Sequence, residues 1–177
     1  MKTRNWEKFN APYDLAISRQ MCQKNGGNVR KTKEVIPADV KTIIDVGSGR
    51  TEEDPRFIEC IDLDSGGDYH WLQHPDNSFD MVFASHALEH SPMPFFALTE
   101  WKRVTKKYIL IVVPRLTHDD EWNDYLCNYK GHFSCFTKEG WRNLFSVAGL
   151  KIVKEIDADW WVHMGVPKPQ TVFLLKK

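Results

Sequence analysis

The stretch that decides the fold is IIDVGSG, residues 43–49. Its first four residues form a short, mostly apolar and β-branched run, which is typical of a buried strand, and Gly47 and Gly49 then indicate a tight turn. Similar short runs follow at residues 57–62 (FIECID) and 79–84 (FDMVFA), and residues 69–72 allow a further, very short strand. These runs predict a sheet whose strands are buried on both faces.

Helical patterns alternate with these strands. Apolar residues recur at helical spacing over residues 12–23, 94–104 and 137–148, and Pro94 and Thr137 suit the first turns of two of these helices. Three more strand-like runs complete the pattern, at residues 108–113, 151–156 and 171–175. Such alternation predicts an α/β fold with a mostly parallel twisted sheet, helices on both faces and an antiparallel C-terminal strand.

Length and composition fit one soluble domain. The 177 residues are 42% hydrophobic and 27% charged, so the chain can bury its own core. We expect a single domain over residues 1–177, with an N-terminal helix and lead-in over 1–40 and the α/β core over 41–177. No apolar run approaches the length of a membrane span, and residues 1–7 lack a signal-peptide pattern, so we expect a cytoplasmic protein without membrane contact.

Lysine and arginine total 24, as do aspartate and glutamate, so the formal net charge is zero. Proteins that bind nucleic acid usually carry a basic excess, because neutralising phosphates supplies much of their affinity. The balance disfavours a nucleic-acid partner. The oligomeric state stays open.

The candidate ligand-binding residues lie at the ends of the predicted strands. Ligands of open α/β sheets bind at the carboxyl ends of the strands, where glycines allow a close approach and an acid suits ribose hydroxyls. Residues 50–55 (RTEEDP) follow the glycine turn, and their three acids and proline make a poor phosphate cradle. A phosphate-free nucleoside with a positive centre is favoured, and S-adenosylmethionine is such a ligand.

Residues 41–150 resemble the class I S-adenosylmethionine-dependent methyltransferases, specifically the small type-11-like group. Four segments carry the resemblance: IDVGSG at 44–49, CIDLD at 60–64, DNSFDMV at 76–82 and SHALEH at 85–90. The resemblance implies a Rossmann-like methyltransferase fold, methyl transfer from S-adenosylmethionine, and S-adenosylhomocysteine as the product. Because the sequence shows no separate substrate domain and no basic surface, we expect a small-molecule acceptor, namely a metabolite or a sugar-like compound.

The resemblance also assigns cofactor-binding roles. Gly47 and Gly49 would let the backbone pass the cofactor, Asp45 would hold the turn or the methionine amino group, and Asp62 would accept the ribose hydroxyls. Asp68 corresponds to the position that binds the adenine amino group, with residues 69–72 as the adenine wall. The full predicted set is Asp45, Gly47, Ser48, Gly49, Asp62, Leu63, Asp64, Asp68 and Ser85.

The chain departs from the family pattern in three places. Thr51 replaces the usual third glycine, the first two crossovers are short, and residues 105–107 (TKK) replace the usual Pro-Gly-Gly turn. These departures support an alternative, in which the chain is a non-catalytic binding or regulatory module with a methyltransferase fold.

Two histidines are the candidate catalytic bases. His86 follows the strand at 79–84, and His132 lies in the polar and aromatic region 115–136, where acceptor-binding groups are expected. We predict that this region lines one cavity with residues 160–161 (WW), opening onto Gly47 and Ser85. Whether the acceptor is an oxygen, nitrogen or carbon nucleophile stays open.

Two patterns imitate metal sites. Residues 86–90 spell H-x-x-E-H, but the ligands of that signature need a continuous helix, and Pro92 and Pro94 follow at once. Cys127, His132 and Cys135, with His118 upstream, match no common zinc spacing. We therefore expect no metal.

Overall fold

The computed structural model describes residues 32–47, 54–61, 67–129, 131–158, 162–163, 166–167 and 169–177. The helix predicted over residues 12–23 lies outside these ranges. So do five predicted cofactor-binding residues: Ser48, Gly49, Asp62, Leu63 and Asp64.

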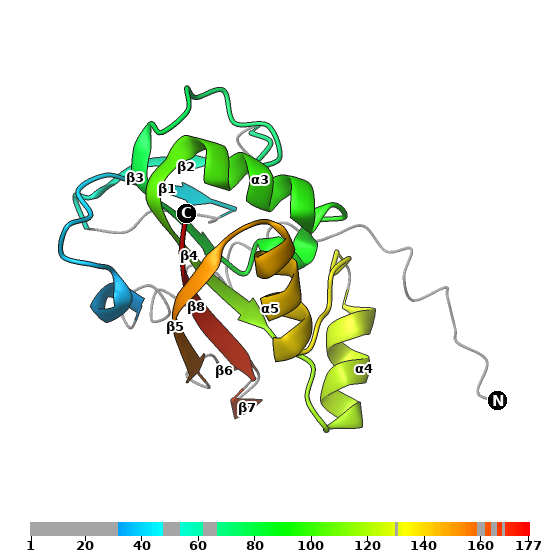
Figure 1. Cartoon of the computed structure of the whole chain (residues 1–177). Helices are drawn as coiled ribbons and strands as arrows, with labels where there is room; N and C mark the ends of the chain where they lie inside the picture. Colours follow the sequence, from blue (N-terminus) through cyan, green and yellow to red (C-terminus); the bar gives the residue numbers. More distant parts are fainter. Residues whose placement is uncertain are drawn as a thin grey trace.

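A six-stranded sheet forms the centre of the protein, in the order β2-β1-β3-β4-β8-β5 (Figure 1). The first four strands of that order are parallel, and β8 runs antiparallel to both β4 and β5. This arrangement confirms the predicted mostly parallel sheet with an antiparallel C-terminal strand. The strands are β1 (Ile43–Val46), β2 (Phe57–Ile61), β3 (Phe79–Ser85), β4 (Thr105–Pro114), β5 (Lys151–Ala158) and β8 (Gln170–Lys176), and a separate pair joins β6 (Val162–His163) to β7 (Val166–Pro167).

Side chains alternate between the two faces of the sheet, and both faces are buried. Ile44 and Val82 belong to a core beneath α3 (Pro94–Val104) and α5 (Lys138–Val147), which lie on the same side of the sheet in Figure 1. Ile43 and Met81 face the opposite side, where residues 35–40 complete a second core. This two-sided burial explains why the strands read as nearly continuous apolar runs.

The ends of the two long helices follow their sequence signals. α3 has Pro94 in its first turn. The Thr137 side chain accepts a hydrogen bond from the Gly140 N–H at the start of α5, and Gly149 adopts a φ of 68° after its end. Only glycine takes that conformation without strain, as the predicted cap requires.

Two local predictions were wrong. Residues 69–72 form a turn rather than a strand, although Tyr69 and Leu72 are buried. Residues within the predicted loop 115–136 form a further helix, α4 (Asp120–Asn128), capped by Asp119. Two short 3-10 turns, η2 (Lys33–Val35) and η4 (Leu88–His90), complete the elements outside the sheet.

Buried tryptophans hold the loops that follow the strands. The indole N–H of Trp101 donates to the Tyr69 carbonyl at 2.9 Å, and that of Trp141 donates to the Pro114 carbonyl at 3.1 Å. A buried indole needs such a partner, because an unpaired N–H would lose its hydration without compensation. These bonds tie loops at the carboxyl ends of the strands to the helical layer.

Asp80 connects the start of β3 to the approach to β1. Its Oδ2 accepts hydrogen bonds from the N–H groups of Lys41 at 2.9 Å and Thr42 at 3.2 Å. Burial alone would raise the pKa of Asp80, but these two bonds and nearby lysines outweigh it and lower the pKa.

We predict that Asp80→Ala lowers the free energy of unfolding by about 2 kcal/mol at pH 7, because two backbone donors lose their acceptor. The folded-state pKa lies below the unfolded one, so the carboxylate's contribution is complete above the unfolded pKa of about 4 and disappears as pH falls through the folded value. Urea unfolding of both proteins from pH 7 to pH 3 measures this. A difference between the two proteins that does not shrink on acidification would contradict the assignment.

Candidate functional site

The carboxyl ends of β1 and β2 lie side by side. Asp45 pairs with Cys60 and Val46 with Ile61 in the parallel register. One residue further, the Gly47 N–H donates to the Ile61 carbonyl at 2.7 Å. The segment that contains Asp62 follows Ile61 directly in the sequence, so the glycine turn and the acidic segment leave the sheet from adjacent strands.

Position 47 requires a glycine for a structural reason that the sequence did not reveal. Its φ is +75°, and a Cβ built on it would lie 2.5 Å from the Cβ of Ala87. We expected the missing side chain to leave space for a ligand, but the nearest atoms belong to Ala87 and Tyr69 of the protein itself. The glycine lets residues 46–47 pack against the segment that follows β3.

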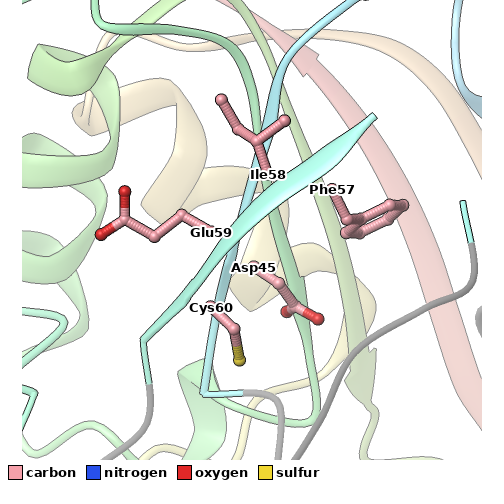
Figure 2. A pocket seen from close by; sticks show the side chains of 5 residues that line it. All are labelled: Asp45, Phe57, Ile58, Glu59 and Cys60. Carbon is pink, nitrogen blue, oxygen red and sulfur yellow. The ribbon is translucent and has the colours of Figure 1, made fainter. Parts of the chain in front are cut away.

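Asp45 lies beneath this turn with 2% of its surface exposed. It lines a small cavity of about 140 Å³ together with Phe57, Ile58, Glu59 and Cys60 of the edge strand β2 (Figure 2). A buried carboxylate next to a cavity at a strand end is the kind of group that can hold a polar ligand or a water molecule.

Asp68 is held by its own loop. Its exposed carboxylate accepts hydrogen bonds from the backbone N–H and the Nδ1 of His70, both at 2.8 Å. The backbone bond is the main reason that its pKa is lowered. Among the residues expected to wall the adenine, Tyr69 and Leu72 belong to the core and Trp71 is 75% exposed.

His86 is the residue after Ser85, where β3 ends, and it adopts an unusual backbone conformation with φ of +53°. Its Nδ1 lies 3.1 Å from Oε1 of Glu89, and its Nε2 lies 2.9 Å from Oε1 of Gln170. Burial alone would lower the pKa of His86, but the bond to Glu89 and its charge outweigh burial and raise the pKa. Both ring nitrogens are therefore engaged, which suits a positioning role better than proton transfer.

His132 reaches the same place from a distant part of the chain. Its Nδ1 donates to the Leu126 carbonyl at 2.8 Å, and burial lowers its pKa, so the ring is neutral at pH 7. Glu89 lies between the two predicted histidines, and its carboxylate meets the His86 ring directly. Burial opposes its ionisation, yet the bond from His86 and the nearby imidazoles keep the pKa of Glu89 lowered.

Sequence reasoning missed Glu89 and Gln170. The signal for Glu89 was its place inside the quoted motif SHALEH, but its partner His132 is 43 positions away, and no spacing rule relates them. Gln170 opens β8, and antiparallel pairing with β4 brings it to the end of the sheet near His86.

The predicted acceptor region is only partly assembled in the described residues. The N–H groups of Phe133 and Ser134 donate to the Glu89 carbonyl at 2.9 and 3.0 Å, so this loop lies against η4. His118 is exposed, Asp119 caps α4, and residues 160–161 lie outside the described ranges. The cavity of Figure 2 is lined by none of the residues of 115–136. The single cavity that we expected also involves residues 160–161, outside the described ranges, so it stays a prediction.

Comparison with known proteins agrees with this architecture. Residues 42–112 match the methyltransferase domain family of type 11. No curated protein sequence matches the chain significantly.

Solved methyltransferase structures share the fold over most of their length. A Thermotoga maritima S-adenosylmethionine-dependent methyltransferase, described as a possible histamine N-methyltransferase, aligns with a TM-score of 0.63 and 17% identity over 97% of this chain and 98% of its own. An Aquifex aeolicus S-adenosylmethionine-dependent methyltransferase aligns with a TM-score of 0.60 and 16% identity over 96% and 95%. A Haloferax volcanii protein in complex with the Trm112 methyltransferase activator aligns with a TM-score of 0.63 and 15% identity over 92% and 93%.

Residues 42–112 are thus similar to the type-11 methyltransferase domain family, and solved S-adenosylmethionine-dependent methyltransferases share the fold of the chain. The matched family segment contains β1, β2, β3 and most of β4, so the glycine turn and the SHALEH motif both lie within it. S-adenosylmethionine is the cofactor of this family. No helix in the described part of the chain is long and apolar enough to cross a membrane.

We predict that Gly47→Ala destabilises the protein by about 2 kcal/mol or more, because it combines a left-handed φ with a close contact to Ala87. Adding Ala87→Gly should recover part of this loss by removing the contact, but not the part due to the backbone conformation. Urea unfolding of both single variants and the double variant measures the coupling. If the effects of the two substitutions are simply additive, the turn does not pack as described.

Proposed function

We propose that the protein transfers a methyl group from S-adenosylmethionine to a small-molecule acceptor, either a metabolite or a sugar-like compound. The observation that carries the cofactor part is the bond between Gly47 and Ile61, which brings the glycine turn and the start of the acidic segment to one edge of the sheet. Ligands of open α/β sheets bind at this edge.

Within this proposal, the cofactor lies across the ends of β1 and β2. Ser48 and Gly49 pass the methionine and ribose portions, while Gly47 and Asp45 shape and support the turn. Asp62, Leu63 and Asp64 face the ribose, Asp68 meets the adenine amino group, and Ser85 borders the methyl-transfer position. The described members of this set fit the cofactor, since Asp45 supplies a buried carboxylate beside a cavity and Gly47 provides a tight turn.

The cofactor supplies the electrophilic methyl group, so the chain has to align the acceptor and exclude water. An acceptor hydroxyl or amine must also lose a proton. Of the two predicted bases, His132 is the better proton acceptor, because its ring is neutral and the Leu126 carbonyl fixes the proton on Nδ1. His86 instead positions Glu89.

The charge distribution supports a small acceptor over nucleic acid. Basic side chains near the sheet pair with acids: Arg103 with Glu100 and Asp76, and Lys107 with Asp39. On α5, Arg142 pairs with Glu139 and Glu155 in the same way. Cations neutralised in this way contribute little to phosphate binding.

A binding module remains the second candidate. The short crossovers and Thr51 favour it, and the Haloferax volcanii protein shows that a chain with this fold assembles with an activator. The two candidates differ in turnover rather than in fold.

Calorimetry with S-adenosylhomocysteine and an assay of its release from S-adenosylmethionine with pooled hydroxyl and amine metabolites test the proposal. We expect product binding in the micromolar range and acceptor-dependent release of S-adenosylhomocysteine. Product binding without turnover would favour the binding module, and no binding near millimolar product would overturn both the cofactor site and the enzyme.

We predict that Asp62→Ala weakens S-adenosylhomocysteine binding more than Asp64→Ala does. The acid that directly follows the end of β2 should face the ribose, and loss of a charged acceptor should cost about 1.5–3 kcal/mol. The matched variant Asp64→Ala has the same change in charge two residues further on. Equal dissociation constants in calorimetry would show that the register of this segment is wrong.

A further inference from the structure

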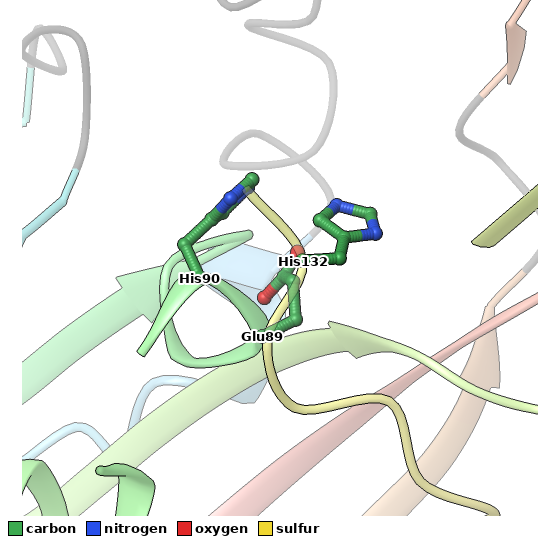
Figure 3. Close-up of side chains that lie close together, drawn as sticks. All are labelled: Glu89, His90 and His132. Atoms are coloured by element: carbon green, nitrogen blue, oxygen red, sulfur yellow. The ribbon is translucent and has the colours of Figure 1, made fainter. Parts of the chain in front are cut away.

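Three side chains beside the end of β3 converge without serving the proposed cofactor site. Glu89, His90 and His132 each offer one ligand atom, and these three atoms lie within 4.8 Å of one another (Figure 3). Glu89 and His90 come from η4, and His132 comes from the loop after α4. We propose that they form a binding site for a divalent transition-metal ion of the Zn²⁺ class.

The buried carboxylate of Glu89 favours a bound metal ion. Its side chain is 1% exposed, and its Oε1 receives His86 while its Oε2 accepts no hydrogen bond from any described residue. A buried carboxylate oxygen without a partner is costly, and it needs a cation or a donor to offset that cost. A metal ion beside Oε2 would supply this charge.

The orientation of the His90 and His132 rings also favours a bound metal ion. Nδ1 of His90 lies 2.9 Å from the Gly131 carbonyl, and Nδ1 of His132 lies 2.8 Å from the Leu126 carbonyl. A carbonyl only accepts, so Nδ1 of each ring is the donor in these bonds and Nε2 is the atom through which each ring would bind a metal ion. Metal-binding histidines show this same arrangement, in which a backbone carbonyl orients the ring.

The two segments are also held together by the protein itself. The Glu89 carbonyl accepts from the N–H groups of Phe133 and Ser134, and the Ser134 hydroxyl donates to the Ser91 carbonyl at 2.8 Å. With metal bonds of about 2.0 Å, ligand atoms of a tetrahedral site lie about 3.3 Å apart. The three ligand atoms, which lie within 4.8 Å of one another, would have to move closer by up to about 1.5 Å to bind one ion.

This ligand set differs from the one that the sequence suggested. The H-x-x-E-H pattern would pair His86 with His90 on one helix, but η4 has only three residues and His86 is engaged by Glu89 and Gln170. Two imidazoles and a carboxylate suit Zn²⁺ and related ions, and three protein ligands leave one position open. With the ion bound, Nε2 of His132 is a metal ligand and no longer a base, and the ion would instead promote loss of the proton from an acceptor oxygen in the open position. That catalytic role rests on the proposed function, whereas metal binding itself does not.

The test uses tag-free full-length protein that has been dialysed against a chelator. Zn²⁺ titration by calorimetry should show one ion per chain and a raised Tm, because the ion binds the folded state. Co²⁺ should bind the same site and give the visible spectrum of nitrogen and oxygen ligation without a thiolate charge-transfer band.

His132→Gln should weaken Zn²⁺ binding by about 100-fold or more, since even loss of an outer hydrogen bond costs 10–100-fold at metal sites. Two matched controls should bind as tightly as the parent: His118→Ala, an exposed histidine of the same region, and Cys127→Ser, an exposed thiol. His90→Gln replaces His132→Gln if the latter does not fold. Absence of stoichiometric Zn²⁺ binding, retention of binding in the histidine variant, or a thiolate band would overturn the proposal. Binding of S-adenosylhomocysteine is measured in a separate experiment. A protein that does not bind S-adenosylhomocysteine but binds Zn²⁺ would overturn the proposed function and leave the metal site standing.

Discussion

The hydrogen bond from the Gly47 N–H to the Ile61 carbonyl, 2.7 Å long, fixes the carboxyl ends of β1 and β2 at the same level. The left-handed conformation of Gly47 makes this bond compatible with close packing against Ala87, and Tyr69 lies nearby. The glycine turn thus connects the sheet to the segment after β3. The proposed cofactor edge depends on this contact, because a shift of either strand would separate the turn from the acidic segment that follows Ile61.

Glu89 organises the neighbouring edge in a comparable way. Its carboxylate meets three histidines, and its backbone carbonyl binds the loop at 133–134. A buried charge of this kind is stable only with partners that come from several elements, and here they come from the residue after β3, η4 and the loop after α4. The side-chain amide of Gln170, the first residue of β8, completes the surroundings of His86. The position where β3 ends is therefore held by polar contacts in addition to the apolar packing of Ala84, Ala87 and Leu88.

The sequence predicted the parts of the fold that depend on local patterns. The helices α3 and α5 end close to the predicted positions, because Pro94, Thr137 and Gly149 act on their immediate neighbours. α4 was missed because Trp122 and Leu126 are its only buried residues, too few to produce a clear helical period. The turn at 69–72 was read as a strand because Tyr69 and Leu72 are apolar, yet long-range bonds to Trp101 and Arg103 hold it.

The candidate site shows the same division between features that local sequence signals predict and features that depend on tertiary contacts. Gly47 and Asp45 could be found from one motif, whereas the meeting of His132 with Glu89 depends on how a loop folds back over 43 residues. Sequence reasoning also assigned Gly47 to ligand space, because it could not show that Ala87 occupies the adjoining position. Local signals thus predicted the cofactor edge, and only tertiary contacts revealed the polar cluster next to the end of β3.

Hydrogen–deuterium exchange with and without S-adenosylhomocysteine tests the central claim most directly, namely that the ends of β1 and β2 form the cofactor edge. The account predicts ligand-induced protection in peptides that cover residues 45–50 and 60–68, and unchanged exchange in β5 on the opposite edge of the sheet. Protection confined to β5 and β8, or no protection at saturating ligand, would contradict it.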